Sequence, residues 1–306
     1  MTILKDADSC KNQKLIKMVG VVRIQLMKTY LDCFPCFLNQ ALRAARMATT
    51  DEKKIKKVVD EVGMMLQNIS LESSPPESGR LIYQKVHEIT GNPDPYREIK
   101  SQSTKKALSL YPYLKNLVEN SENRLLTAIR IAIAGNVIDF GPNRPFDMET
   151  EIETTLTKDF GICDYDSFEK ALNESNEILY IGDNAGECVF DRILIETLNK
   201  PVTYVVRGAP IINDATHADA RQAGIERVAT LLSSGTDAPG TILKTCSDQF
   251  IRIYNDAKLI ISKGQGNYEA LSNQKKSIFF LLKTKCRVIA DDIGLKEGDI
   301  VLKGGQ

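Results

Sequence analysis

The chain has 306 residues, of which 42% are hydrophobic and 26% charged, so it has the composition of an ordinary globular protein with room for a sizeable core. Forty basic and forty acidic residues cancel, which leaves no global field to attract nucleic acid or an anionic membrane. No apolar stretch reaches the roughly 20 residues that span a bilayer, and the opening residues lack the apolar core of a secretory signal, so we expect a soluble intracellular protein.

Residues 1–135 show only helical patterns. Apolar residues recur at helical spacing over residues 55–66 and again over residues 107–118. The segment LLTAIRIAIA (125–134) is apolar nearly all round, which is typical of a buried helix. The sequence therefore predicts an all-helical amino-terminal region that ends near residue 135.

The first 26 residues are a separate question. They are polar and weakly patterned until Ile16, and Met27 would serve as a natural start. Residues 1–26 are therefore either an extension of the protein or an extra first helix, and the sequence favours neither.

After residue 135 the pattern changes, and short apolar segments alternate with helical stretches. This alternation is typical of a largely parallel sheet flanked by helices. We expect a Rossmann-like α/β/α sandwich over residues 136–306, with the helical region packed on it as a bundle. The expected strands are residues 178–181, 202–206, 258–262, 277–282, 286–290 and 299–302.

A turn in the middle of the chain carries the strongest functional signal. The segment GDNAGE (182–187) follows the first of these apolar strands, at its carboxyl end, where open α/β sheets bind ligands. Asp183 and Asn184 offer two neighbouring oxygen donors, which suit magnesium, manganese and similar divalent ions. Taken alone, the motif fits a metal site and a simple helix cap by Asp183 equally well.

A second acid lies in the same kind of position. Asp214 follows the strand 202–206 and a short loop, just before the helical run 215–223. Because sequential strands of a parallel sheet are often neighbours, we expect Asp183 and Asp214 to face one cleft. A helix cap is the simpler interpretation of Asp214 alone, but two acids at one sheet edge favour a shared cation. His217 is better explained as an exposed helical residue than as a ligand.

A third candidate residue, a lysine, also lies at the end of an expected strand. Lys263 closes an apolar strand and is followed by Gly264 and Gly266. A lysine beside open backbone amides suits a phosphate group, although the order of residues is not that of a P-loop. An isolated lysine in a glycine turn would be an ordinary surface residue, but two acids at the same sheet edge favour a phosphate site.

The CFPC segment (33–36) is the fourth candidate. One pair of cysteines without a second pair or a nearby histidine is a weak zinc signal, and no βαβ pattern surrounds it to indicate a redox motif. Two half-buried thiols at the start of a helix over 37–48 are the better interpretation, with half of a metal site or a redox-sensitive disulfide as alternatives. Seven cysteines without a secretory signal indicate free thiols and a cytoplasmic protein.

Six segments in this order resemble the metal-dependent damage-control phosphatases: CFPCFLNQALRAAR, AGNVIDFG, GDNAGE, NDAT, SSGTDAPGT and SKGQGNYEAL. The match is to the prokaryotic, cysteine-bearing subgroup of what was long known as domain-of-unknown-function family eighty-nine, and it covers nearly everything from Met27 onward. The resemblance implies a helical bundle on an α/β/α domain. It also implies a manganese, cobalt, nickel or magnesium ion held by Asp183, Asn184 and Asp214.

The same resemblance implies a reaction and further site residues. The expected reaction is the hydrolysis of phosphate monoesters of small metabolites, such as sugar phosphates or damaged phosphometabolites. The phosphate-binding lysine of the family matches Lys263. The GN-x-x-D element of the family, here Asn136 and Asp139, would line the same cleft.

The chemistry of these residue types agrees with that reaction. A site with three oxygen ligands leaves coordination positions for a substrate phosphate and a water. An acid such as Asp183 or Asp214 would orient or deprotonate this water. A covalent route with Asp183 as nucleophile is the competing mechanism, but such enzymes commonly carry D-x-D, and here position 185 is alanine. The sequence therefore favours a phosphomonoester hydrolase that uses metal-activated water.

Two other classes of function stay open. One is a protein that binds a phosphometabolite or nucleotide without turning it over. The other is an S-adenosylmethionine-dependent methyltransferase on a Rossmann-like sheet, against which the acidic turn at Asp183 argues. The sequence makes no prediction of the oligomeric state.

Overall fold

The computed structural model describes residues 27–135 and 148–305. In these residues the strands form one seven-stranded sheet in the order β1-β7-β6-β5-β2-β3-β4. Strands β2 to β6 are mutually parallel, whereas β7 pairs antiparallel with β6 and parallel with β1. The predicted α/β class with a largely parallel sheet is thereby confirmed. The strands are β1 (Phe160–Cys163), β2 (Ile178–Ile181), β3 (Val202–Val206), β4 (Thr230–Ser233), β5 (Ile260–Lys263), β6 (Ile278–Lys283) and β7 (Ile300–Gly304).

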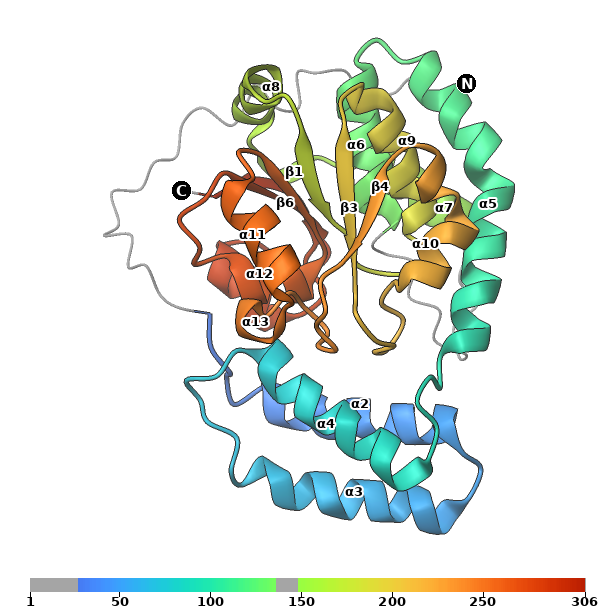
Figure 1. Cartoon of the computed structure of the whole chain (residues 1–306), viewed down its shortest axis with the longest axis vertical. Coiled ribbons are helices and arrows are strands. Elements are labelled where there is room, and N and C mark those ends of the chain that lie inside the picture. Colours follow the sequence, from blue (N-terminus) through green and yellow to red (C-terminus); the bar gives the residue numbers. More distant parts are fainter. Residues whose placement is uncertain (1–26, 136–147, 306) are drawn as a thin grey trace.

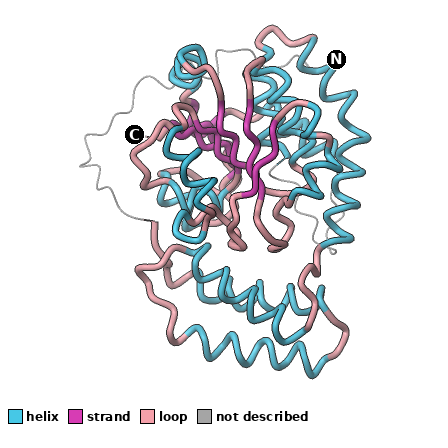
Figure 2. The backbone as a smooth tube through the Cα atoms, viewed as in Figure 1, coloured by secondary structure: helices cyan, strands magenta, loops and turns pink. Residues whose placement is uncertain are grey.

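The sheet is buried on both faces because its strands contribute alternately to two hydrophobic cores. In β2 all four residues are buried. Tyr180 packs in one core, where its ring stacks on Tyr204 with 5.3 Å between the centroids, and Leu179 and Ile181 pack in the other. Continuous apolar runs are typical of parallel strands that are covered by helices on both sides. Figure 2 shows the strands in the middle of the molecule with helices around them.

Helices α5 to α10 contribute to the first core and α11 to α13 to the second (Figure 1). The predicted α/β/α layers are therefore present. The helices are α5 (Arg97–Glu119), α6 (Arg124–Gly135), α7 (Met148–Thr157), α8 (Tyr165–Glu174), α9 (Cys188–Leu198), α10 (His217–Ala223), α11 (Asp248–Asp256), α12 (Gln265–Leu271) and α13 (Arg287–Ile293), with two short 3-10 turns at Ile225–Arg227 and Leu243–Thr245.

Three further helices form a bundle beneath the sheet in Figure 1 and enclose a core of their own: α2 (Cys33–Ala48), α3 (Glu52–Leu66) and α4 (Pro75–Thr90). Helices α5 and α6 also precede residue 136, but they share the core of the sheet, and α6 packs closely on α9. The division into an all-helical domain that ends at residue 135 and a catalytic domain from residue 136 stays a prediction. Residues 1–26, whose status the sequence left open, lie outside the described part of the chain.

One predicted strand is wrong. Residues 286–290 lie mostly in α13, which buries Ile289 and Ala290 and ends at Gly294 in the left-handed conformation with φ 79°. A short apolar run cannot be assigned to a helix or a strand by periodicity alone. The sequence pattern also misses β1 and β4. These are the two edge strands, and each has only one fully buried residue, so neither shows a continuous apolar run.

The cysteines of the CFPC segment are both free thiols, with Cys33 buried and Cys36 exposed. Their helix begins at Cys33, four residues earlier than the sequence indicated. The two thiols therefore lie at a helix start, as expected, but neither is half-buried. Cys163 departs from the expectation of free thiols, because it is disulfide-bonded.

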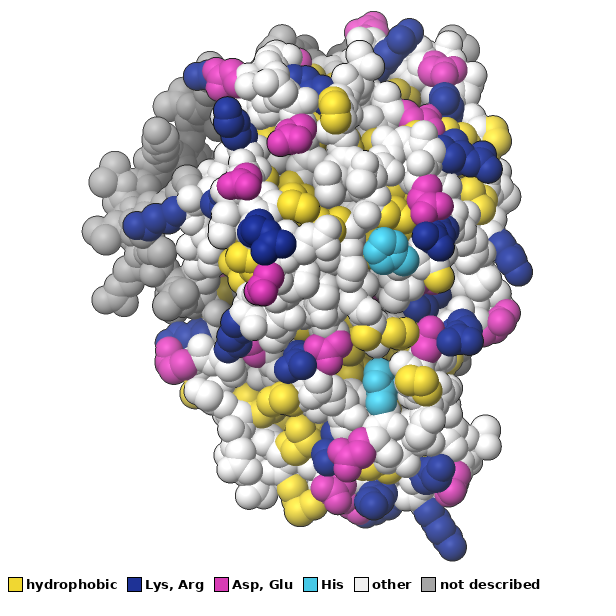
Figure 3. Space-filling model, in the orientation of Figure 1, with side chains coloured by type: hydrophobic (Ala, Val, Ile, Leu, Met, Phe, Trp, Pro, Cys, Tyr) yellow, Lys and Arg dark blue, Asp and Glu magenta, His cyan; other side chains and the backbone are white. Residues whose placement is uncertain are grey.

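The surface carries both signs of charge. Figure 3 shows lysine and arginine interspersed with aspartate and glutamate over the visible face, without a large region of one sign. Within residues 27–135 and 148–305, no helix has both the length and the apolar character needed to cross a membrane.

The contact between α6 and α9 gives a first testable prediction. A Cβ atom added at Gly135 would lie 2.9 Å from Phe190 Cβ, so the two helices must separate to admit it. We expect Gly135→Ala to lower the free energy of unfolding by about 1–3 kcal/mol, as measured by urea denaturation. Gly63→Ala in α3 is the matched control, because nothing lies within 4 Å of the added Cβ. It should raise the stability by about 0.5–1 kcal/mol, and an equal effect of both substitutions would contradict this packing.

Candidate functional site

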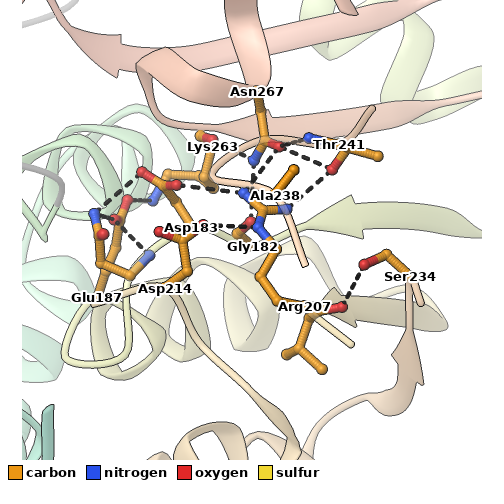
Figure 4. Close-up of polar contacts among 12 residues, drawn as sticks. Gly182, Asp183, Glu187, Arg207, Asp214, Ser234, Ala238, Thr241, Lys263 and Asn267 are labelled. Atoms are coloured by element: carbon orange, nitrogen blue, oxygen red, sulfur yellow. Dashed lines mark hydrogen bonds and ion pairs between the residues drawn. The ribbon is translucent and has the colours of Figure 1, made fainter. Parts of the chain in front are cut away.

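The strand order places the predicted site residues at the switch point of the sheet. From β2 the sheet extends through β3 and β4 on one side, whereas β5 and β6 are added on the other. In open α/β sheets, ligands bind at the carboxyl ends of the strands where the order reverses in this way. Asp183 follows β2 at this edge, and Lys263 is the last residue of β5. Both lie in Figure 4 with the loop that follows β3.

Backbone hydrogen bonds join the two acidic turns. The N–H of Ala215 donates to the carbonyl of Asp183 at 2.7 Å, and the N–H of Ala185 donates to the carbonyl of Asn213 at 2.9 Å. Between these two bonds, Asn184 and Asp214 form an isolated antiparallel bridge. The structure therefore brings Asp183, Asn184 and Asp214 together, as the sequence predicted, and all three are at least nine-tenths buried.

Neither acid caps a helix. The residue before α9 is Glu187, and its side chain makes no capping hydrogen bond. The cap of α10 is Thr216, in a capping box with Asp219. The simpler interpretation of Asp183 and Asp214 as helix caps is therefore wrong, and a cation shared by the two acids stays a prediction.

Arg207 connects the two acids, and the sequence analysis missed it. Its Nε donates to Asp214 Oδ2 at 2.7 Å, and its Nη2 lies 3.6 Å from Asp183 Oδ1. The guanidinium is almost completely buried. A signal was present in the sequence, because Arg207 directly follows the apolar strand VTYVV and is itself followed by glycine, much as Lys263 ends its own strand and precedes a glycine.

Asn267, in the first turn of α12, is a second residue that the sequence analysis left without a role. Its Oδ1 accepts hydrogen bonds from Arg207 Nη2 at 3.2 Å, the Thr241 N–H at 2.9 Å and the Thr241 hydroxyl at 2.8 Å. Its Nδ2 donates to the carbonyls of Gly182 at 3.0 Å and Lys263 at 2.7 Å. Asn267 therefore fixes the ends of β2 and β5, the loop before α11 and the guanidinium in one arrangement (Figure 4).

Lys263 lies at the same edge but is fully buried. Its Nζ donates to Asp191 Oδ1 at 2.5 Å, to the carbonyl of Ala132 at 2.8 Å and to Glu187 Oε1. Three acceptors use all three donors of an ammonium group. The prediction that Lys263 binds a substrate phosphate stays a prediction, and such a contact requires the ammonium group to leave one of these partners.

Asn136 and Asp139 lie outside the residues that the structure describes. His217 is the first residue of α10 and only partly buried, and His87 lies in α4, where burial lowers its pKa.

The site carries more negative than positive charge. Burial and the neighbouring Asp214 and Glu187 raise the pKa of Asp183 to about 8, although Arg207 opposes the shift. Burial also raises the pKa of Asp214, again against the effect of Arg207. Among the described residues, four buried carboxylates and two buried basic groups meet here: Asp183, Glu187, Asp191, Asp214, Arg207 and Lys263.

A divalent cation fits this arrangement by charge and by donor chemistry. The formal excess of two negative charges equals the charge of one such ion. Both hydrogens of the Asn184 amide are used, since Nδ2 donates to Asp183 Oδ2 at 3.1 Å and to Glu187 Oε2 at 3.0 Å. The amide oxygen is therefore the atom left for a ligand. No group of three or more His, Cys, Asp or Glu side chains suited to a metal occurs among the described residues.

Comparison with known proteins identifies the family. The model of the damage-control phosphatase ARMT1-like domain matches residues 29–301. The chain belongs to this family. A damage-control phosphatase of Pyrococcus horikoshii is 36% identical over 282 residues, which are 90% of this chain and 97% of that protein. A damage-control phosphatase of Archaeoglobus fulgidus is 36% identical over 279 residues, 89% of this chain and 97% of that protein.

A solved structure extends the similarity to the fold. The crystal structure of a DUF89 family protein from Pyrococcus horikoshii matches with a TM-score of 0.84 and 35% sequence identity, over 92% of this chain and 100% of that chain. The family predicted from the six sequence segments and the fold predicted with it are both confirmed.

The ion pair at the centre of the site gives a second prediction. We expect Arg207→Gln to lower the free energy of unfolding of the metal-free protein by about 3 kcal/mol, because it leaves two buried carboxylates without their cation. Arg221→Gln is the control, since Arg221 and Glu226 form an exposed pair and exposed pairs contribute about 1 kcal/mol or less. Urea denaturation measures both, and similar losses would show that Arg207 does not neutralise these acids.

Proposed function

We propose that this member of the damage-control phosphatase family hydrolyses phosphate monoesters of small metabolites with the help of a divalent metal ion. The observation that carries the proposal is the meeting of Asp183, Asn184 and Asp214 at the switch point of the sheet. The names of the relatives from Pyrococcus horikoshii and Archaeoglobus fulgidus support the reaction class.

Asp183, Asn184 and Asp214 would hold the ion through side-chain oxygens. Oxygen donors of this kind suit magnesium, manganese, cobalt or nickel. An ion held there supplies Lewis-acid polarisation of a phosphate oxygen and lowers the pKa of a bound water. The protein itself contributes the fixed positions of the three side chains and a site that is nearly closed to water.

The two acids have different surroundings and therefore different capacities. Asp214 Oδ2 accepts a hydrogen bond from Arg207 Nε at 2.7 Å. Asp183 Oδ1 lies farther from the same guanidinium, at 3.6 Å from Nη2, and burial raises the pKa of Asp183 to about 8, which suits a general base. Asp183 is accordingly the residue that we assign to orienting and deprotonating the attacking water.

A covalent route through an aspartyl phosphate has less support. Enzymes that use this route commonly carry D-x-D, in which the second acid protonates the leaving oxygen. Position 185 holds a buried alanine whose N–H is bonded to Asn213. Direct attack by water is therefore the favoured mechanism, and the substrate class is a small-molecule phosphate ester.

The reaction gives a third prediction. We expect Asp183→Ala and Asp214→Ala each to lower metal-dependent hydrolysis of p-nitrophenyl phosphate by roughly 1,000-fold, since the ion contributes several kcal/mol to the transition state. Asp164→Ala is the matched control. Asp164 also follows a strand directly, but that strand is β1, which runs opposite to β2, and the carboxylate accepts a bond from the Gly304 N–H. Full activity of either site variant would contradict the assignment.

A fourth prediction separates an enzyme from a silent binder. We expect release of inorganic phosphate from members of a phosphometabolite panel when manganese, cobalt, nickel or magnesium is added, and none after chelation. Metal-dependent thermal stabilisation by the same compounds without phosphate release would indicate a binding protein instead. Stabilisation by S-adenosylmethionine but not by metals would indicate a methyltransferase.

A further inference from the structure

Lys263 is separated from the candidate metal ligands by one residue, Glu187. The ammonium group of Lys263 and the carboxylate of Glu187 are both completely excluded from solvent, and they form an ion pair. Glu187 Oε1 faces Lys263, while its Oε2 accepts hydrogen bonds from the side chain of Asn184 at 3.0 Å and from its backbone N–H at 3.4 Å. Glu187 therefore connects the buried lysine to a side chain of the candidate metal site.

The orientation of the Asn184 amide depends on this carboxylate. Its NH2 group donates to Glu187 and to Asp183, so a flipped amide would place its oxygen against two carboxylates. Ion-binding capacity is lost in that orientation, because the nitrogen has no lone pair to offer. Glu187 thus selects the rotamer in which the Asn184 oxygen is available to an ion.

The far side of Lys263 is anchored as well. Asp191 accepts from Lys263 through Oδ1, from the Tyr180 hydroxyl at 2.7 Å, and from the Tyr204 hydroxyl through Oδ2 at 2.7 Å. The two rings are stacked in the core of the sheet. The ammonium group is consequently held between two carboxylates, and one of them is fixed by the core.

We infer that Lys263 is a positioning residue, which fixes Glu187 so that Glu187 orients Asn184 toward the metal ion. The inference rests on the metal site proposed above and changes the role of the lysine. A lysine that contacts the substrate phosphate sets the affinity for phosphate directly. A lysine that acts through Glu187 and Asn184 sets the affinity for the ion and leaves the phosphate contact to other groups.

Glu187→Gln tests the first link. A glutamine at 187 has one oxygen and one NH2 group, so it cannot accept from both Lys263 and Asn184. Loss of such an orienting partner typically weakens metal binding by about 10- to 100-fold, and we expect this loss in the dissociation constant for manganese, measured by titration calorimetry. Glu196→Gln is the matched control. It removes the same charge from α9 and breaks an ion pair with Lys115, but it contacts neither Lys263 nor Asn184, so manganese affinity should change by less than about threefold, well below the loss of an orienting partner.

The double variant Lys263→Met with Glu187→Gln tests the role of the lysine. It removes one positive and one negative charge, so the net charge at the site is unchanged, and replacement of a buried ion pair by neutral groups is often tolerated by the fold. The glutamine oxygen is then free to accept from Asn184, since no ammonium group competes for it. We expect the manganese affinity of the double variant to recover from the low value of Glu187→Gln to within about threefold of the wild type. Such a recovery would show that the effects of positions 187 and 263 on manganese binding are strongly coupled.

Inorganic phosphate, titrated into the manganese-loaded proteins, decides between the two roles. Wild-type phosphate affinity in the double variant supports the positioning role. At least tenfold weaker phosphate binding with manganese affinity restored would overturn it and make Lys263 a substrate contact. If the wild type binds manganese, equal manganese affinity of Glu187→Gln and Glu196→Gln would also overturn the positioning role. A wild type that binds no divalent ion would instead contradict the proposed function itself. Thermal unfolding of each metal-free variant confirms that it is folded.

Discussion

Burial of carboxylates at the carboxyl edge of the sheet is the constraint on which the rest of the site depends. Charged groups are costly to remove from water unless cations or hydrogen-bond donors surround them. Among the described residues, the cost of burying these carboxylates is offset in two ways. Asp191 is satisfied by protein groups alone, namely Lys263 and two tyrosine hydroxyls. Asp183 and Asp214 share the guanidinium of Arg207, and the excess of negative charge around them is the reason that we propose an ion there.

The fold keeps this unfavourable charge in place through the backbone. The turns after β2 and β3 are bonded to each other by main-chain hydrogen bonds, so the acids cannot move apart without breaking them. Asn267 joins the ends of β2 and β5 to the loop that carries Thr241 and to Arg207. Repulsion between carboxylates is therefore opposed by a scaffold that is independent of any ligand, which is the kind of preorganisation that catalysis by electrostatics requires.

Much of this arrangement is visible in the sequence. The strands β2, β3, β5 and β6 are continuous apolar runs because both of their sides are buried, and Asp183, Arg207 and Lys263 lie at or just beyond the ends of three of them. The edge strands β1 and β4 do not form continuous apolar runs, because they are only partly buried. The partners of a charge are harder to predict. Arg207 and Asn267 form a hydrogen bond although they are 60 residues apart in the chain. Lys263 is buried by contacts with Asp191 and with the carbonyl of Ala132 in α6, and no local sequence pattern predicts that these residues lie next to it.

Asp183, Asn184 and Asp214 are proposed to form one metal site, and diffraction from crystals grown with manganese, recorded where manganese scatters anomalously, would locate the ion. We expect one strong anomalous peak within coordination distance of oxygens from all three side chains. A difference map without a peak there, or with its strongest peak at the thiols of Cys33 and Cys36, would contradict this proposal.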